Sequence, residues 1–333
     1  MMAWGTVLEG GTARMAAIEN ILTVDVEEWF HILEVEGGYG RDDWAGLESR
    51  VEANTDALLA LFAETGTRAT CFVVGWVAQR HPALVRRIAA AGHEIGSHSF
   101  WHEVVGRHSR ASLAQDLAGS RKLLEDLAGQ RVRGFRAPGG SITHATAWAL
   151  DVIAEAGFAY DSSLNPGHSS HGGFATPHLG PHRVRTEHGE LFEIPWTTVG
   201  VAGRRVPFAG GGYLRLFPRR VIEACIAIEN RAGRPASVYV HPREIDPEQP
   251  RMALPWRRRF KYYVGLRSTA PKLRALLGAH RFVPAGAWLD AHGAAIAGSV
   301  FDTRSLPRPA PATPDPGRVP PPPPLGAEES IAS

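Results

Sequence analysis

Two histidines, His98 and His102, stand four residues apart at the end of a short expected strand over residues 93–99. Neutral imidazole nitrogens suit zinc and similar divalent metals, and a helical turn of the chain would bring both rings onto one ion. The chain holds fifteen histidines, so a pair at this spacing also arises by chance. The pair alone therefore leaves a metal site and an ordinary turn equally open.

Two carboxylates near the N-terminus favour the metal site. Asp25 and Glu27 lie at the end of the β-branched run that begins at Ile21, and side chains two residues apart on a strand project to the same side. One carboxylate can complete a site of two histidines and one acid, while the other takes a proton from water whose pKa the ion lowers from about 15.7 toward 7. Alternatively, each is a solvated strand end or a helix cap.

The elements that must position these residues alternate between strand and helix. This alternation predicts parallel strands with crossover helices, an α/β fold whose polar residues cluster at the strand ends, where a barrel or an open sheet places its active site. The expected strands are 21–26, 70–74, 93–99, 134–138, 158–163 and 237–242, and the expected helices are 50–64, 82–91, 112–128, 146–156 and 219–231.

The second half of the chain departs from this alternation. Residues 172–217 hold nine glycines among short β-like runs such as LFEIPW and GGYLRLF, and we expect an irregular β insertion there. Residues 252–277 are basic and amphipathic, with a cluster at Arg257, Arg258, Arg259 and Lys261, and are expected to close the domain.

The expected organisation is one catalytic domain between two unstructured ends. The domain covers residues 19–300, after a flexible segment 1–18, and its last part, about 244–300, is an extension. Ten of the 25 prolines fall between Pro307 and Pro324, so residues 301–333 are expected to form a disordered tail.

Composition excludes several classes of protein. Lysine and arginine number 36 against 34 acidic residues, a net charge of +2, which lacks the basic excess of a general nucleic-acid binder. Two cysteines far apart, Cys71 and Cys225, cannot form a disulfide framework or a cysteine zinc site.

No run reaches the roughly 18 apolar residues of a membrane helix, and the N-terminus does not read as a signal peptide. The expected location is the cytoplasm, with a peripheral position at the inner membrane left open.

Five motifs in order carry a resemblance to a known family. The segments TVDVEEWFH, SHSFWH, FRAPGGSIT, YDSSLNP and VYVHPREID resemble the motifs of the polysaccharide deacetylase family, of the NodB-homology or carbohydrate esterase family 4 type, and span Thr23 to Pro242. More narrowly, DVEEWFH, GGGYLRLFP, HPREIDPEQPR and FKYYVGL resemble the branch found with exopolysaccharide and exosortase gene clusters, which carries an extra C-terminal region. The resemblance implies a distorted (β/α) barrel.

The resemblance implies a metal site with His98 and His102 as ligands. The commonest family pattern has two adjacent aspartates, but Val26 stands in the second place here and cannot bind metal. Glu27 is the natural substitute as third ligand, and Glu28 is the competitor. The implied ion is most often zinc, with cobalt, nickel or iron as alternatives.

The resemblance also implies the residues that move protons. Asp25 is the general base, and Arg136, in FRAP, holds its carboxylate in the ionised form. His241, in YVHP, is the general acid, and Asp161, in YDSS, pairs with it to keep it protonated. Without the resemblance, Arg136 reads as a surface arginine beside a turn, His241 as a structural residue at a strand end, and Asp161 as a turn residue.

The implied reaction is metal-assisted removal of acetyl groups from N-acetylhexosamine units of a bacterial exopolysaccharide or its precursor, acted on before export. A backbone N–H near residues 138–140 would help to stabilise the oxyanion. The aromatic side chains Trp29, Phe100, Trp101 and Tyr213 are candidates for stacking on sugar rings or for simple packing, and Arg243 is expected at the substrate rim. Two alternatives stay open: a hydrolase of another small amide or cyclic imide, and a carbohydrate-binding protein with a decayed site.

Overall fold

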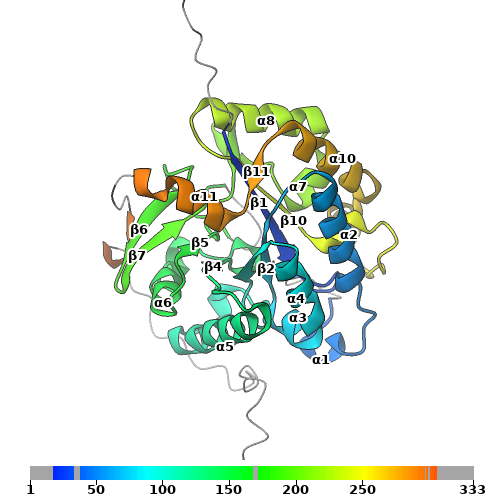
Figure 1. Cartoon of the computed structure of the whole chain (residues 1–333), viewed down its shortest axis with the longest axis horizontal. Coiled ribbons are helices and arrows are strands. Elements are labelled where there is room, and N and C mark those ends of the chain that lie inside the picture. The colour runs from blue at the N-terminus through cyan, green and yellow to red at the C-terminus, as the bar shows by residue number, and fades with distance from the viewer. Residues whose placement is uncertain (1–17, 34–37, 168–171, 297, 299–300, 306–333) are drawn as a thin grey trace, which may run out of the picture.

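The structure is a computed structural model, and it describes residues 18–33, 38–167, 172–296, 298 and 301–305. Its centre is a ten-stranded, mostly parallel sheet in the order β10-β1-β2-β3-β4-β5-β7-β6-β12, with β11 pairing with β1 off this path. Helices lie around the sheet (Figure 1). The arrangement confirms the expected α/β fold, and the path runs from β10 to β12 without closing into a barrel.

The strands of the large sheet pair in parallel except β6 and β7, which are antiparallel, and β8 and β9 form a separate antiparallel hairpin. The bounds are β1 (Asn20–Val26), β2 (Thr70–Val73), β3 (Glu94–Ser97), β4 (Gly134–Phe135), β5 (Tyr160–Asp161), β6 (His182–Thr186), β7 (Gly189–Glu193), β8 (Thr198–Val201), β9 (Arg204–Pro207), β10 (Ser237–Val240), β11 (Phe282–Val283) and β12 (Phe301–Asp302).

The helices begin and end where local chemistry favours it. In α5, for example, Ser109 caps the N-terminus by accepting a hydrogen bond from the Ser112 N–H at 3.2 Å, and Gly129 ends the helix with a φ of 63°. Among the residues that the structure describes, no helix is long and apolar enough to span a membrane. The helices are α1 (Arg41–Trp44), α2 (Val51–Glu64), α3 (Gly75–Arg80), α4 (Pro82–Ala90), α5 (Arg110–Ala128), α6 (Ala149–Glu155), α7 (Gly211–Leu216), α8 (Arg219–Arg231), α9 (Trp256–Tyr263), α10 (Leu266–Ala279) and α11 (Ala285–His292).

Strand β1 lies at the centre of the fold. It pairs with β10 on one side and β2 on the other, and all seven of its residues are buried. A strand covered on both faces reads as a nearly continuous apolar run, which is why its position was evident from the sequence. Asp25 lies near the carboxyl end of β1, and Glu27 follows one residue beyond the strand.

One expected β-like run is a helix. GGYLRLF was expected within the irregular β insertion, but Gly211–Leu216 forms α7, so that expectation is wrong. Gly211 takes a φ of 53°, a left-handed conformation that glycine adopts without a steric cost, and the chain turns into the helix there. A Cβ on Gly210 would lie 2.0 Å from the Tyr239 ring, so the glycines also let α7 approach β10 closely. The rest of the insertion does contain strands, β6 to β9.

The two expected unstructured ends are mostly not tested. Residues 1–17 and 306–333 lie outside the described residues, and the second range includes the whole proline-rich segment from Pro307 to Pro324. At the start of the expected tail, however, Phe301–Asp302 forms β12 and pairs with β6, opposite Val184 and Arg185. Phe301–Asp302 therefore belongs to the large sheet, although the sequence places it at the start of a disordered tail.

Candidate functional site

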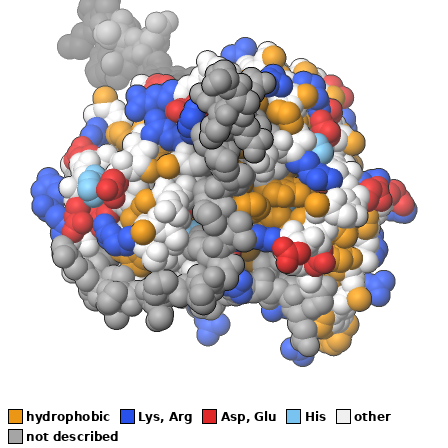
Figure 2. Space-filling view, turned by 90° about the horizontal axis from the view of Figure 1, so that it is seen from below, with side chains coloured by type: hydrophobic (Ala, Val, Ile, Leu, Met, Phe, Trp, Pro, Cys, Tyr) orange, Lys and Arg blue, Asp and Glu red, His pale blue; other side chains and the backbone are white. Residues whose placement is uncertain are grey.

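The candidate residues follow neighbouring strands at one edge of the sheet. Asp25 and Glu27 stand at the end of β1, His98 follows β3, Arg136 follows β4, and His241 follows β10. Because these strands are parallel neighbours, their carboxyl ends meet at the same edge. Strand β1 descends in Figure 1, so this edge faces the viewer in Figure 2.

The two histidines converge without a helix. Ser99 has a φ of 62° and His102 a φ of 54°, so the turn between the two rings uses left-handed backbone positions, and the expectation of a helical turn is wrong. The turn is held by hydrogen bonds from the His102 N–H to Ser99 Oγ at 2.8 Å and from the Phe100 N–H to Asp116 Oδ1 at 2.8 Å. The imidazole centroids of His98 and His102 lie 5.1 Å apart.

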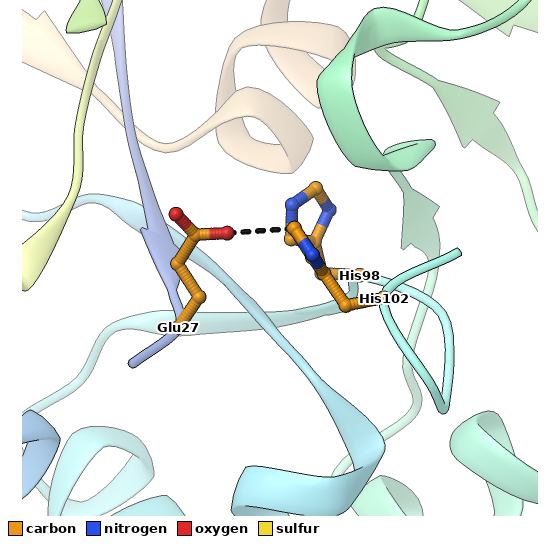
Figure 3. Close-up of side chains that lie close together, drawn as sticks. All are labelled: Glu27, His98 and His102. Atoms are coloured by element: carbon orange, nitrogen blue, oxygen red, sulfur yellow. Dashed lines mark ion pairs between the residues drawn. The ribbon is translucent and has the colours of Figure 1, made fainter. Parts of the chain in front are cut away.

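Glu27, His98 and His102 form a buried cluster of metal-binding side-chain types. One donor atom from each lies within 4.8 Å of the others, and Nε2 of His102 lies 2.6 Å from Oε2 of Glu27 (Figure 3). Two imidazole nitrogens and a carboxylate oxygen suit zinc, cobalt, nickel or iron. The residues that the sequence singled out therefore fit a divalent ion.

The protonation of the cluster also fits an ion. His98 donates its Nδ1–H to the carbonyl oxygen of Arg136 at 2.8 Å, which leaves the Nε2 lone pair for a ligand bond. Burial lowers the pKa of His98 to about 4, so its ring is neutral near pH 7. Burial opposes ionisation of Glu27, but His102 and then His241 outweigh it and hold the pKa of this carboxyl well below its usual range.

Glu28, the competing acid, points elsewhere. Its carboxylate accepts hydrogen bonds from the Ser49 hydroxyl and from the Arg50 N–H, the latter at 3.1 Å. Burial raises the pKa of Glu28 above its usual value. The structure thus places Glu27, and not Glu28, beside the two histidines.

Arg136 fixes the carboxylate of Asp25. The Nη1 atom of this buried arginine lies 2.7 Å from Asp25 Oδ1 and also donates to the Thr23 hydroxyl at 2.8 Å. Its Nε and Nη2 atoms donate to the carbonyl and the hydroxyl of Ser162 at 3.1 and 2.8 Å. The guanidinium is therefore held by Asp25, Thr23 and Ser162, and the alternative of a surface arginine beside a turn is excluded.

His241 faces both carboxylates of β1. Its Nε2 lies 3.8 Å from Asp25 Oδ2 and 3.6 Å from Glu27 Oε1, and its Nδ1 lies 3.3 Å from Glu244 Oε2. Burial favours the neutral ring, but the charges of Glu27, Glu244 and Asp25 outweigh it and raise the pKa of His241.

The partner of His241 differs from the expected one. Asp161 accepts a hydrogen bond from the Ser163 hydroxyl at 2.6 Å and lies opposite Glu193 in the register of β5 and β7. Within the described part of the chain, the carboxylate beside His241 Nδ1 is Glu244. The expected pairing of Asp161 with His241 is therefore corrected: β5, which ends at Asp161, lies beyond β4 in the sheet, whereas β10, which precedes His241, is at the start of the strand order.

Glu244 is itself held by charge. It accepts a hydrogen bond from the His241 N–H at 3.0 Å and forms a buried ion pair with Arg215 of α7. Burial opposes its ionisation, but Arg215 and His241 outweigh it and lower the pKa of Glu244 to about 2. Neither residue is among the candidates from the sequence, although an acid three residues after His241, in HPRE, is a usable signal for Glu244.

A pocket of about 560 Å³ opens over these residues. Gly139, from the segment expected to supply an oxyanion donor, lines it, and so does Arg243, whose guanidinium lies 5.2 Å from the Tyr262 ring. Figure 2 shows hydrophobic side chains gathered in one area of this face, bordered by charged ones. The aromatic side chains that line the pocket are Trp196, Tyr213, Tyr239, Phe260 and Tyr262.

The four aromatic residues proposed to stack on sugar rings differ in whether they line the pocket. Tyr213 lines the pocket, as expected for contact with a ring of the substrate. Trp101 lines a smaller neighbouring pocket of about 160 Å³. Trp29 and Phe100 are buried at 4% and 2% exposure and line neither pocket, so for these two the packing alternative holds.

Comparison with known proteins gives two adjacent matches. Residues 42–160 match the family model described as polysaccharide deacetylase, and residues 162–290 match the model described as a domain of unknown function (DUF3473). The first region holds His98, His102 and Arg136, and the second holds Arg215, His241 and Glu244, so the candidate site draws on both.

Curated relatives and one solved structure agree with this. The chain is 33% identical over 104 residues to the peptidoglycan-N-acetylglucosamine deacetylase of Bacillus cereus, covering 31% of this chain and 47% of that protein. It is 30% identical over 100 residues to the chitooligosaccharide deacetylase of Azorhizobium caulinodans, covering 30% and 45%. A crystal structure from Mycobacterium smegmatis, assigned to the polysaccharide deacetylases, shares the fold, with a TM-score of 0.56 at 20% identity over 90% of this chain and 96% of that one.

Residues 42–160 therefore form a polysaccharide deacetylase region, and the curated deacetylases align with about a third of this chain. In this chain the deacetylase region is followed directly by the DUF3473 region. The family resemblance read from the five motifs is thus confirmed. The chain spans less than half the length of these curated relatives.

Proposed function

We propose that the protein is a metal-dependent N-deacetylase, which removes acetyl groups from N-acetylhexosamine units of a bacterial exopolysaccharide or its precursor. The observation that carries the proposal is the convergence of Glu27, His98 and His102 with Asp25 and His241 at one end of the sheet, in a pocket large enough for a sugar unit. The names of the curated relatives, which act on peptidoglycan and chitooligosaccharides, support the reaction class.

In this proposal Glu27, His98 and His102 hold a divalent ion. The bound ion would polarise the acetyl carbonyl and lower the pKa of water at the site. Zinc is the ion we favour, because two neutral imidazoles and one carboxylate with an open position are typical of catalytic zinc sites. Cobalt, nickel and iron are the alternatives for the same donor set.

Two residues would move the protons. Asp25, oriented by Arg136 at 2.7 Å, takes a proton from the attacking water. His241, whose raised pKa keeps the ring protonated to higher pH, gives a proton to the amide nitrogen as the C–N bond breaks. Acetate and a free amine leave. A backbone N–H near Gly139, which lines the pocket, is the candidate donor to the oxyanion.

The substrate would lie along the aromatic wall of the pocket. Tyr213, Trp196 and Tyr262 offer flat apolar faces of the kind that pack on sugar rings, and Arg243 lies beside them. We infer that the polymer or its precursor is met in the cytoplasm, before export.

The decisive experiment combines metal analysis with acetate release. We expect the purified protein to carry about one equivalent of metal and to release acetate from N-acetylglucosamine oligomers, and His98→Ala to lose both. A panel of small amides and cyclic imides, assayed in parallel, separates the polysaccharide substrate from the small-amide alternative. Absence of bound metal, together with no acetate release by either the wild type or Asp25→Asn, would overturn the proposal in favour of a binding protein.

A further inference from the structure

Helix α9, Trp256–Tyr263, stands out among the helices because none of its residues is buried. Trp256 is 74% exposed and Phe260 is 58% exposed, far above the usual exposure of such large apolar side chains. The two residues are four apart, so they lie on the same face of the helix, one turn from each other. They form a continuous apolar ridge in the part of the chain that the structure describes.

This ridge leads to the mouth of the 560 Å³ pocket. Phe260 lines that pocket, and so does Leu216 of α7, which is 48% exposed. Trp256, one turn away from Phe260 on α9, does not line the pocket. The exposed apolar side chains therefore surround the entrance rather than the interior of the proposed active site.

The same segment concentrates positive charge. Residues 251–267 contain six basic residues and no acidic one, whereas the remaining chain has thirty basic and thirty-four acidic residues. Arg257, Arg258 and Arg259 are all exposed on α9, and the Arg257 guanidinium lies 5.2 Å from the Trp256 ring. Basic and large apolar side chains thus occur together on one exposed helix.

We propose that α9 and Leu216 form a docking surface for an anionic lipid bilayer, and that the deacetylase works on glycan attached to that bilayer. Aromatic side chains that project from a basic helix are typical of segments that lie in a membrane interface, and each basic residue near an anionic surface adds attraction. A soluble anionic polymer could pair with the arginines, but it would leave the large apolar side chain of Trp256 exposed to water.

The surface has a fixed position relative to the pocket. Arg215 donates hydrogen bonds to the carbonyl oxygens of Lys261 at 2.7 Å and Val264 at 3.2 Å, at the end of α9. The same guanidinium pairs with Glu244, which lies beside His241. A bilayer held against α9 would therefore meet the entrance of the pocket at a defined distance from the proposed general acid. This second part of the inference rests on the proposed function, whereas docking itself does not.

The test is co-sedimentation of the full chain with vesicles of equal parts phosphatidylglycerol and phosphatidylcholine, and with vesicles of phosphatidylcholine alone. We expect binding to the anionic vesicles that weakens with salt. Trp256→Ala and the double change Arg257→Glu with Arg259→Glu should each lower the partition coefficient by about tenfold or more.

Helix α8 offers matched controls away from the pocket. Val221 and Ile228 are 43% and 46% exposed, and Arg220 and Arg231 are exposed as well. Val221→Ala with Ile228→Ala, and Arg220→Glu with Arg231→Glu, remove the same kinds of side chain and should leave vesicle binding unchanged. Equal losses in the α8 and α9 variants, or no binding by the wild type, would overturn the proposal.

Two further readouts separate the possible failures. Dextran sulfate that binds as tightly as the anionic vesicles, with no effect of Trp256→Ala, would assign the surface to an anionic polymer and overturn membrane docking. Acetate release from soluble N-acetylglucosamine oligomers should be the same in Trp256→Ala and the wild type, because Trp256 does not line the pocket. Vesicle binding without acetate release would leave docking in place and overturn the deacetylase.

Discussion

The Nδ1 atom of His241 lies 3.3 Å from Oε2 of Glu244, a carboxylate only three residues further along the chain. Glu244 also receives the His241 N–H and the guanidinium of Arg215, so its position is fixed from two sides. A carboxylate in this position orients the imidazole and favours its protonated form. The carboxylate that orients the proposed general acid, His241, therefore comes from the same short segment of the chain.

We expect Glu244→Gln to lower kcat by about tenfold to 100-fold with little change in KM, because the ring loses a negatively charged partner. The pKa of His241 is raised in part by Glu244, so the variant should lose activity at lower pH on the alkaline side of the profile. Glu248→Gln, at an exposed side chain nearby, is the control and should match the wild type. If the alkaline limb of the pH–activity profile moved in Asp161→Asn and stayed in place in Glu244→Gln, Asp161 and not Glu244 would be the partner of His241.

Asp25→Asn should retain metal and lose at least about 100-fold in kcat, because an amide cannot take the proton from water. The substitution keeps the shape of the side chain and an oxygen that can accept from Arg136. Metal content and melting temperature, measured beside acetate release, check that only the proton transfer has been removed. Wild-type turnover in this variant would exclude Asp25 as the base.

Glu27→Gln and Glu28→Gln form a matched pair at adjacent positions. We expect Glu27→Gln to lose most of its metal, whereas Glu28→Gln should keep it and lose about 1 kcal/mol of stability through weaker contacts with Ser49 and Arg50. A metal titration should raise the melting temperature of Glu28→Gln and of the wild type, because an ion that binds only the folded state stabilises it. Metal loss confined to Glu28→Gln would reverse the assignment.

The buried pair of Asp161 and Glu193 predicts a pH dependence of stability. Burial, and then the nearby Asp161, raise the pKa of Glu193 well above its usual 4.5, so Glu193 keeps its proton to higher pH in the folded protein than in the unfolded chain. A carboxyl with a raised folded-state pKa stabilises most fully below its unfolded pKa, and this contribution is lost as pH rises through the raised value.

Glu193→Gln should therefore flatten the decline of the melting temperature as pH rises above the usual carboxyl pKa of 4.5, since the amide can donate to Asp161 and accept from the Leu164 N–H without ionising. The control is Glu190→Gln on the same strand, where the side chain is half exposed and pairs with Arg183; we expect a change within about 0.5 kcal/mol. Identical pH profiles for Glu193→Gln and the wild type would contradict a protonated Glu193.

Much of the site could be predicted because its residues follow strands that are plain in the sequence. The apolar runs before Asp25, His98 and His241 fix where each strand ends, and parallel pairing brings those ends together. Continued by one residue beyond β1, the period of two of the strand also predicted that Asp25 and Glu27 lie on one side. Beyond the last paired residue that period no longer applies, which is why Glu28 could not be excluded from the sequence.

What the sequence could not predict depends on contacts between distant elements. The partner of His241 is decided by Arg215 on α7, and α7 itself was read as β-like because a run of glycines gives no clear period. Trp29 and Phe100 are the same kinds of residue as Trp196 and Phe260, which line the pocket. Only the packing of the tertiary structure shows that Trp29 and Phe100 are buried instead.

The pairing of β1 with β10 also sets an order in which the chain can be assembled during synthesis. Val24 lies opposite Val240, whereas β2 and β3, which position His98 and His102 beside β1, follow it within the first third of the chain. As the chain leaves the ribosome, Glu27 and both histidines can come together long before His241 has been made. The nascent protein would then be able to capture an ion before it can turn over substrate.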